Sequence, residues 1–252
     1  NALERLNRLG EAQAALARVQ RGDRPEPTLI GARLTRRRGQ PRQALARLRP
    51  LLDRPAGGIE AGTLGDLWQQ LALSADLAGD YDAVLPAAAK AKEMWRQLAP
   101  EIDGEAFLEH LAALGRGPEL ARLEPGEGGT EAPAGLVFFV GFPRSGTTLM
   151  ENLLAAHPGV QTTAEADFLF RAIAELVPAE AVTRHDLVAA RRQYLDDLRA
   201  DYPGMSELVI VDKLPLNIVN GRWIDALFPE AKLLVALRHP RDAVLSSVLQ
   251  RF

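Results

Sequence analysis

Apolar residues follow different patterns in the two halves of this 252-residue chain. In roughly the first hundred residues they recur three or four positions apart, which is the pattern of amphipathic α-helices. Further along, short unbroken apolar runs alternate with helical stretches, and these runs are residues 136–140, 208–211 and 233–237. Runs of this kind are typical of strands buried in a parallel sheet. The pattern therefore predicts an α-helical part followed by an α/β part.

Three similar segments in the helical part indicate an imperfect repeat. Residues 10–16, 39–45 and 79–85 each begin with a glycine and carry a small residue five positions later. Each glycine would close a tight turn between two paired helices. The spacings of 29 and 40 residues lie on either side of the roughly 34-residue tetratricopeptide (TPR) period. We predict a TPR-like repeat domain over residues 1–123, with an irregular helical domain as the alternative.

The composition changes abruptly between the two parts. Residues 124–135 are rich in proline and glycine and poor in apolar side chains, so we expect a linker there. The predicted order is a TPR-like domain at 1–123, a linker at 124–135 and an α/β domain at 136–252. Right-handed crossovers through the intervening helices would make the strands parallel.

The first predicted strand runs directly into a glycine-containing loop and a helix that begins near Thr147. Gly141 and Gly146 allow backbone conformations closed to other residues and let the main chain approach a ligand. Free N–H groups and the dipole at the helix start favour an anion, and Arg144 adds donors suited to phosphate or sulfate oxygens. The glycine spacing is that of the nucleotide P-loop, but Thr147 stands where that motif has lysine. A differently charged nucleotide is therefore favoured over magnesium-bound ATP or GTP.

A basic residue follows each of the three predicted strands, namely Arg144, Lys213 and Arg238. The carboxyl ends of parallel strands lie along one edge of the sheet, where ligands bind in open α/β folds. Three cations at the same position predict a polyanionic ligand. Asp212, directly after a predicted strand, resembles the Walker B aspartate and supports a P-loop kinase or NTPase as an alternative.

Composition excludes several kinds of site. The chain has no cysteine, which excludes disulfides, thiolate catalysis and cysteine metal sites. No apolar run is long enough to cross a bilayer and the start has no signal-peptide layout, so we expect a cytoplasmic protein. A net charge of −3 argues against a general nucleic-acid binder. Residues 1–58 carry 13 arginines and 5 acids; this excess could steer an acidic partner, although solvated helix faces are the simpler interpretation.

The loop sequence FPRSGTTL at residues 142–149, with Asp212-Lys213 and residues 238–246, resembles the sulfotransferases that use 3′-phosphoadenosine 5′-phosphosulfate (PAPS). The helical first half makes the chain similar to TPR-containing sulfotransferases, whose catalytic domain resembles that of tyrosylprotein sulfotransferases. The resemblance implies transfer of a sulfuryl group from PAPS to a hydroxyl of a protein tyrosine, a carbohydrate or a small molecule. Similar enzymes continue past the last matching segment, so the α/β domain is expected to be partial.

The resemblance also implies roles for individual residues. The 5′-phosphosulfate would be held by Arg144, Ser145, Gly146, Thr147 and Thr148, and the 3′-phosphate by Arg238 and Ser246. Glu165 would be the catalytic base, and Lys213 would stabilise charge on the leaving phosphate. A sulfuryl group carries less charge than a terminal phosphoryl group, so no metal is expected.

Several alternatives remain open at this point. Family members often have glycine before the catalytic glutamate, where this chain has Ala164. Glu165 could instead be an acid favoured by a helix start, and His157 could be a base or could cap the preceding helix. The TPR-like domain would bind the acceptor or a protein or peptide partner. A protein with an inactive rear domain would be an interaction scaffold.

Overall fold

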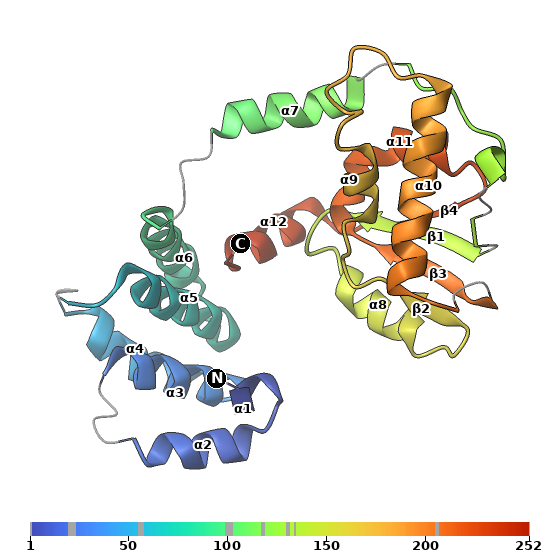
Figure 1. Cartoon of the computed structure of the whole chain (residues 1–252). Helices are drawn as coiled ribbons and strands as arrows, with labels where there is room; N and C mark the ends of the chain where they lie inside the picture. Colours follow the sequence, from blue (N-terminus) through green and yellow to red (C-terminus); the bar gives the residue numbers. More distant parts are fainter. Residues whose placement is uncertain are drawn as a thin grey trace. The chain divides into compact units, whose positions relative to one another are not determined.

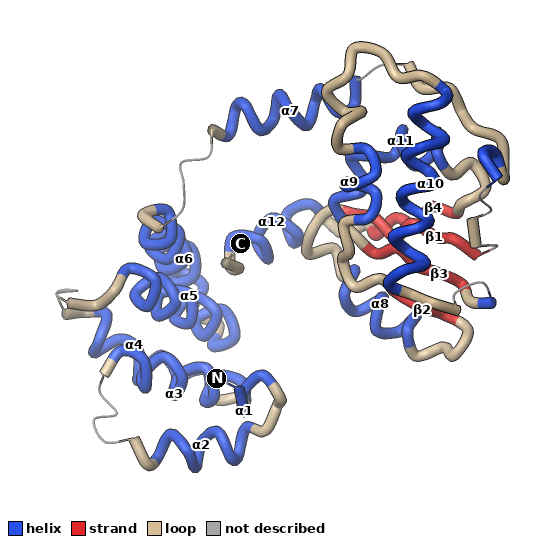
Figure 2. The backbone as a smooth tube through the Cα atoms, viewed as in Figure 1, coloured by secondary structure: helices blue, strands red, loops and turns tan. Residues whose placement is uncertain are grey.

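The computed structural model describes residues 2–19, 24–54, 58–98, 103–116, 119–129, 132–133, 135–204 and 207–251. The chain forms two compact units, both visible in Figures 1 and 2. The helical unit consists of Asn1–Ile102 together with Leu245–Phe252, and the α/β unit consists of Asp103–Val244.

The helical unit contains six helices in its described N-terminal residues: α1 (Ala2–Arg5), α2 (Leu9–Ala17), α3 (Pro25–Arg37), α4 (Pro41–Leu52), α5 (Ala61–Ala78) and α6 (Tyr81–Arg96). Helix α3 packs against α4, and α5 packs against both α4 and α6. Leucine and alanine side chains fill the core between them. Leu249 is buried in the same core, and the Gln69 side chain donates a hydrogen bond of 3.0 Å to the Leu249 carbonyl.

Two of the three predicted glycine turns are present. Gly39 follows α3 with φ 76° and Gly79 follows α5 with φ 77°, so both adopt the left-handed conformation that glycine tolerates best. The prediction for Gly10 is wrong, because Gly10 lies inside α2. Asn7, with φ 58°, makes the left-handed turn before α2, and asparagine is one of the few other residues that visit this region. The structure thus contains two helical hairpins closed by glycine turns, while a TPR-like repeat stays a prediction.

The α/β unit is built on a four-stranded parallel sheet in its described residues, with strand order β2-β3-β1-β4. The strands are β1 (Gly135–Gly141), β2 (Val160–Thr162), β3 (Val209–Lys213) and β4 (Lys232–Ala236). The three predicted strands and their parallel arrangement are confirmed. Strand β2 was missed because three residues are too few to show a periodic pattern.

Helices complete this unit: α7 (Gly104–Arg116), α8 (Thr147–Ala155), α9 (Phe168–Ile173), α10 (Arg184–Asp201), α11 (Gly221–Leu227) and α12 (Pro240–Val248), with 3₁₀ turns η1 (Glu127–Gly129) and η3 (Pro215–Asn220). From Leu245 onward α12 counts with the helical unit. Helices α9, α10 and α11 pack on the sheet face that carries Phe138 and Ile210 (Figure 1). No described helix combines the length and the apolar character that a membrane crossing requires.

Leu123, just before the predicted linker, and Glu127 within it contact the α/β unit. The Leu123 N–H donates to the Ala226 carbonyl at 2.9 Å, and Leu123 is buried in the core. Glu127 pairs with Arg184 at the start of α10. Contacts therefore divide the chain between residues 102 and 103, before α7. Residues 130, 131 and 134 of the predicted linker, like 117 and 118 before it, lie outside the described residues. The division into 1–123, 124–135 and 136–252 stays a prediction.

Candidate active site

The loop between β1 and α8 has the backbone shape of an anion cradle. Helix α8 begins at Thr147, as predicted, with Gly146 before it in the left-handed conformation at φ 91°. The Met150 N–H donates to the Gly146 carbonyl at 3.1 Å, so helical bonding starts only there. The N–H groups of the preceding first turn cannot bond within the helix and point out of its end. A positive partial charge at this end favours an anionic ligand.

Gly141 is needed for a different reason from the one that the sequence predicted. A Cβ at this position would lie 2.8 Å from the Ala236 carbonyl oxygen and 3.0 Å from the Ala236 Cβ of β4. Its φ is not in the left-handed region, unlike that of Gly146. Gly141 therefore lets β1 and β4 approach each other at their carboxyl ends.

The predicted phosphosulfate-binding residues differ in exposure. Arg144, Gly146 and Thr148 are exposed, and Ser145 is half-buried. Thr147 is only 4% exposed, so the Thr147 side chain lies within the protein and its backbone N–H belongs to the helix start. Four of the five residues therefore present side chain or backbone to the surface of the loop.

Lys213, the last residue of β3, lies between two carboxylates. Its Nζ is 2.6 Å from Glu165 Oε1 and 2.8 Å from Glu151 Oε2 of α8. The Lys213 side chain is 3% exposed, that of Glu151 is 12% exposed and that of Glu165 is 52% exposed. The prediction of three like cations at the sheet edge needs correction, because two acids more than balance the charge of Lys213. Arg144 and Arg238 remain exposed.

Glu151 was missed in the sequence, although one signal was present. On α8 the residues Thr147, Glu151 and Leu154 are four and three positions apart, so they share the helix face that the sheet partly or fully covers. An acid on an inward helix face needs a partner. Lys213 is that partner.

Glu165 lies in a tight turn rather than in a helix. Ala164 has φ 49° and Glu165 has φ 64°, and α9 begins only at Phe168. The alternative of a first-turn helix acid is therefore wrong. The Glu165 N–H donates to the Lys213 carbonyl at 3.0 Å, which ties this turn to the end of β3.

Backbone strain is concentrated at this site. Among the described residues the non-glycine positions with positive φ are Asn7, Arg144, Ala164 and Glu165. Three of these four lie at the site: Arg144 in the cradle loop, and Ala164 and Glu165 in the turn before α9. Strain of this kind persists only where surrounding contacts impose it, and it clusters at functional sites.

Asp212 faces the opposite side of the sheet from Lys213, since neighbouring strand residues alternate. Its carboxylate is fully buried and accepts hydrogen bonds from the Tyr194 hydroxyl at 2.8 Å and the Thr163 hydroxyl at 3.3 Å. Burial raises the pKa of Asp212 to about 6 and raises the pKa of Tyr194 well above 10. The Thr163 hydroxyl also accepts from the Lys213 N–H at 3.2 Å. Asp212 therefore anchors the strand end in the core, which removes its support for a Walker B role.

Two further predicted residues lie beyond β4. The Arg238 guanidinium donates to the Arg144 carbonyl at 2.9 Å, so it fastens the cradle loop to the end of β4. Ser246 lies on α12 in the segment that counts with the helical unit, and its joint role with Arg238 stays a prediction.

His157 and Asp167 have local structural contacts. The His157 N–H donates to the Leu154 carbonyl just past α8, and its Nδ1 accepts from the Gly159 N–H at 3.0 Å. This geometry supports the capping interpretation of His157 over that of a base. Asp167 is the N-cap residue of α9. Within the described residues no three His, Asp or Glu side chains are grouped closely enough to hold a metal ion.

Comparison with known proteins places the α/β part in a family. Residues 137–252 match the family described as the Sulfotransferase family. An uncharacterized protein of Aquifex aeolicus (strain VF5) is 30% identical in an alignment of 197 residues that covers 69% of this chain and 24% of that protein. The protein-tyrosine sulfotransferase of Drosophila melanogaster is 32% identical over 128 residues, 46% of this chain and 25% of that protein.

Protein-tyrosine sulfotransferase 1 of Homo sapiens is 29% identical over 128 residues, 46% of this chain and 34% of that protein. The chain thus spans between 24% and 34% of the length of these curated relatives. No solved structure matched. The cradle loop, Glu165 and Lys213 all fall within the matched segment, and residues 137–252 belong to the sulfotransferase family.

Proposed function

We propose that this chain carries a PAPS-dependent sulfotransferase site that acts on a hydroxyl acceptor. The observation that carries the proposal is the anion cradle between β1 and α8 beside the Lys213–Glu165 ion pair at the end of the adjacent strand β3. Strands β1 and β3 are direct neighbours and parallel, so both features lie at the same edge of the sheet. Such an edge is the usual ligand position in open α/β folds.

The cradle residues fit a sulfated nucleotide. The open helix start of α8, the left-handed Gly146 and the exposed Arg144 and Thr148 offer N–H, guanidinium and hydroxyl donors to oxyanions. Arg238, exposed at the end of β4, would hold the 3′-phosphate together with Ser246. PAPS would supply a sulfuryl group already attached to a good leaving group, a phosphate.

In this proposal Glu165 would accept the proton and Lys213 would stabilise the negative charge that the reaction produces. As the acceptor oxygen bonds to sulfur, the bridging bond from sulfur to the phosphate oxygen breaks. The acceptor hydroxyl then loses its proton, and Glu165, whose side chain is 52% exposed, is the acid best placed to take it. Lys213 would stabilise the negative charge that appears on the departing phosphate oxygen.

A transfer assay tests this function. Chain incubated with ³⁵S-labelled PAPS should label at least one acceptor in a panel of a tyrosine-containing peptide, a phenol and a sugar. Glu165→Ala should lower turnover about 10²-fold to 10⁴-fold, the usual contribution of a positioned base, while leaving affinity for 3′,5′-adenosine bisphosphate unchanged. Asp167→Ala, which removes an exposed carboxylate two residues away that pairs with Arg171 at 3.0 Å, is the matched control. Turnover that survives Glu165→Ala would exclude Glu165 as the base.

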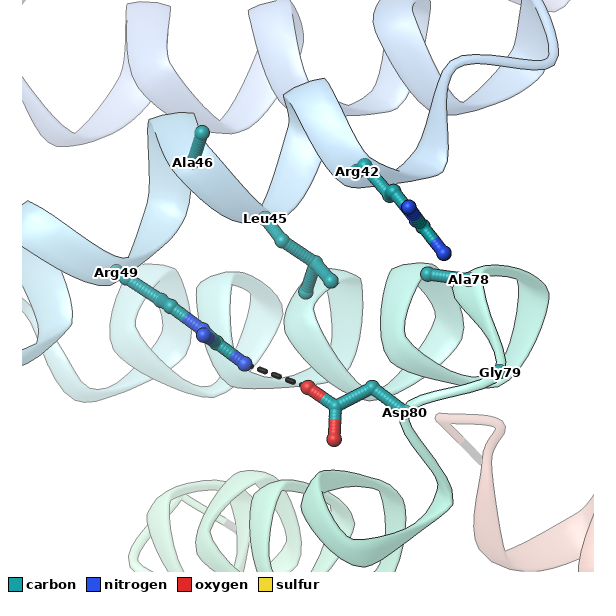
Figure 3. A pocket seen from close by; sticks show the side chains of 7 residues that line it. All are labelled: Arg42, Leu45, Ala46, Arg49, Ala78, Gly79 and Asp80. Atoms are coloured by element: carbon teal, nitrogen blue, oxygen red, sulfur yellow. Dashed lines mark hydrogen bonds and ion pairs between the residues drawn. The ribbon is translucent and has the colours of Figure 1, made fainter.

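The helical unit is our proposed site for binding the acceptor or a protein or peptide partner. A pocket of about 400 Å³ on this unit, shown in Figure 3, is lined by Arg42, Leu45, Ala46, Arg49, Ala78, Gly79 and Asp80. Arg49 pairs with Asp80 at 2.6 Å across the pocket, and Arg42 extends over the turn that joins α5 and α6. Two arginines and one aspartate give the lining a net positive charge, which favours an acidic segment in a partner.

A further inference from the structure

Lys213 has one more carboxylate partner than its charge requires. The group formed by Lys213, Glu151 and Glu165, here called the Lys213 cluster, contains one ammonium and two carboxylates within 2.8 Å of it. A lysine that is only 3% exposed must keep an opposite charge beside it, since an unpaired buried ion is strongly destabilising. One carboxylate would be enough to meet that need. The second must therefore serve another purpose.

The two acids differ in how firmly they are held. Glu151 projects from the regular helix α8, and its side chain is 12% exposed. Glu165 projects from the strained left-handed turn, and its side chain is 52% exposed. The half-exposed Glu165 carboxylate can rotate toward solvent or a ligand at small cost, whereas the enclosed Glu151 carboxylate has little space for another rotamer. The cluster thus has one fixed and one exchangeable partner.

We infer that Glu151 is a positioning residue that keeps Lys213 paired and oriented while Glu165 leaves Lys213 to accept the proton of the acceptor hydroxyl. The inference rests on the proposed function and adds a residue to its site. Without Glu151, Glu165 would be the sole carboxylate partner of the buried ammonium, and its turn to the acceptor would leave Lys213 with no protein counterion. Glu151 acts through Lys213 and does not touch the reacting atoms.

The location of Glu151 suits this role. Helix α8 begins at the anion cradle, and Glu151 lies four positions after Thr147, one turn down the same helix. The contact of Glu151 with Lys213 therefore joins the cradle helix directly to the end of β3. At the same strand end the Glu165 N–H donates to the Lys213 carbonyl, and the Lys213 N–H donates to the Thr163 hydroxyl. Backbone hydrogen bonds thus hold the main chain of Lys213, and Glu151 holds its ammonium.

The decisive experiment measures steady-state kinetics of Glu151→Gln in the full chain with ³⁵S-labelled PAPS and the acceptor panel named above. Glutamine keeps the shape and one hydrogen-bond acceptor but removes the charge. We expect kcat to fall between about tenfold and a hundredfold, the effect of a displaced catalytic group, with the KM of the acceptor and the affinity for 3′,5′-adenosine bisphosphate unchanged. Asn152→Ala, an exposed neighbour on α8, should behave as wild type.

A double-mutant cycle separates positioning from general damage to the fold. If Glu151 acts through Lys213, Glu151→Gln should have no further effect on kcat in a Lys213→Met background. A further loss there as large as in the wild-type background would overturn the inference, as would a Glu151→Gln enzyme with wild-type kcat. Wild-type chain that neither binds the bisphosphate nor transfers label would overturn the proposed function, and the inference with it.

Discussion

Replacing Asp212 by asparagine should change how the stability of the α/β unit depends on pH. The buried carboxyl has a pKa of about 6, raised by burial from its ordinary 3.8. Asparagine has no charge to desolvate and can keep both contacts, because its oxygen accepts from Tyr194 and its amide donates to the Thr163 hydroxyl. The substitution therefore removes mainly the cost of a buried charge.

The sign follows from proton binding in the folded and unfolded states. Below pH 3.8 the carboxyl is protonated in both states and costs nothing. Between pH 3.8 and about 6 the unfolded chain releases the proton first, so the free energy of unfolding falls as pH rises. Above that window the full penalty applies, and a shift of this size corresponds to about 3 kcal/mol. The asparagine side chain of Asp212→Asn does not titrate, so the variant should gain about that much relative to wild type between pH 4 and pH 7.

Urea unfolding followed by tryptophan fluorescence can measure this in the α/β unit alone. A background with Trp68→Phe and Trp95→Phe leaves Trp223, which is 3% exposed in the α/β core, as the reporter. Asp186→Asn is a matched control, because hydrogen bonds from Thr183 lower the pKa of Asp186. The stabilising contribution of ionised Asp186 is lost only as the pH falls below the ordinary pKa of an aspartate. The difference in the free energy of unfolding between Asp186→Asn and wild type should therefore stay constant from pH 5 to pH 7. A difference in the free energy of unfolding between Asp212→Asn and wild type that stays the same from pH 4 to pH 7 would refute the reasoning.

Exchanges between alanine and glycine give further predictions. Ala164→Gly should stabilise the α/β unit by about 0.5–1 kcal/mol, because the φ of 49° strains alanine more than glycine loses in chain entropy; an equal or lower urea midpoint would contradict this. Gly141→Ala should cost about 1–3 kcal/mol, because its Cβ would meet the Ala236 carbonyl at 2.8 Å. Gly221→Ala, where a Cβ meets nothing within 4 Å, should be neutral or stabilising by comparison in the same unfolding assay.

Local patterns predicted much of the α/β unit. The apolar runs at 136–140 and 208–211 became β1 and β3, because a buried parallel strand needs apolar side chains on both faces. The run at 233–237 became the edge strand β4, whose residues are exposed or half-buried rather than buried as the run indicated. Helix α10 begins at Arg184, where Thr183 and Asp186 form a capping box, a start signal that can be read from the sequence.

The parts that could not be predicted depend on contacts between distant residues. The ion pair from Glu151 to Lys213 joins residues 62 positions apart, and no local pattern encodes it. The same holds for the bond from Tyr194 to Asp212, which decides that Asp212 faces the core rather than a nucleotide. In the helical unit the turn at Asn7 replaced the one expected at Gly10, because a left-handed turn accepts either residue type.

The central claim is that the cradle between β1 and α8 binds a sulfated nucleotide without a metal. Isothermal titration with 3′,5′-adenosine bisphosphate in the presence of a metal chelator tests it most directly. We predict one site per wild-type chain and an affinity about 10-fold to 100-fold lower in Arg144→Ala, the usual worth of a charge-assisted hydrogen bond. Heat of binding from ATP with magnesium, but none from the bisphosphate, would contradict the claim.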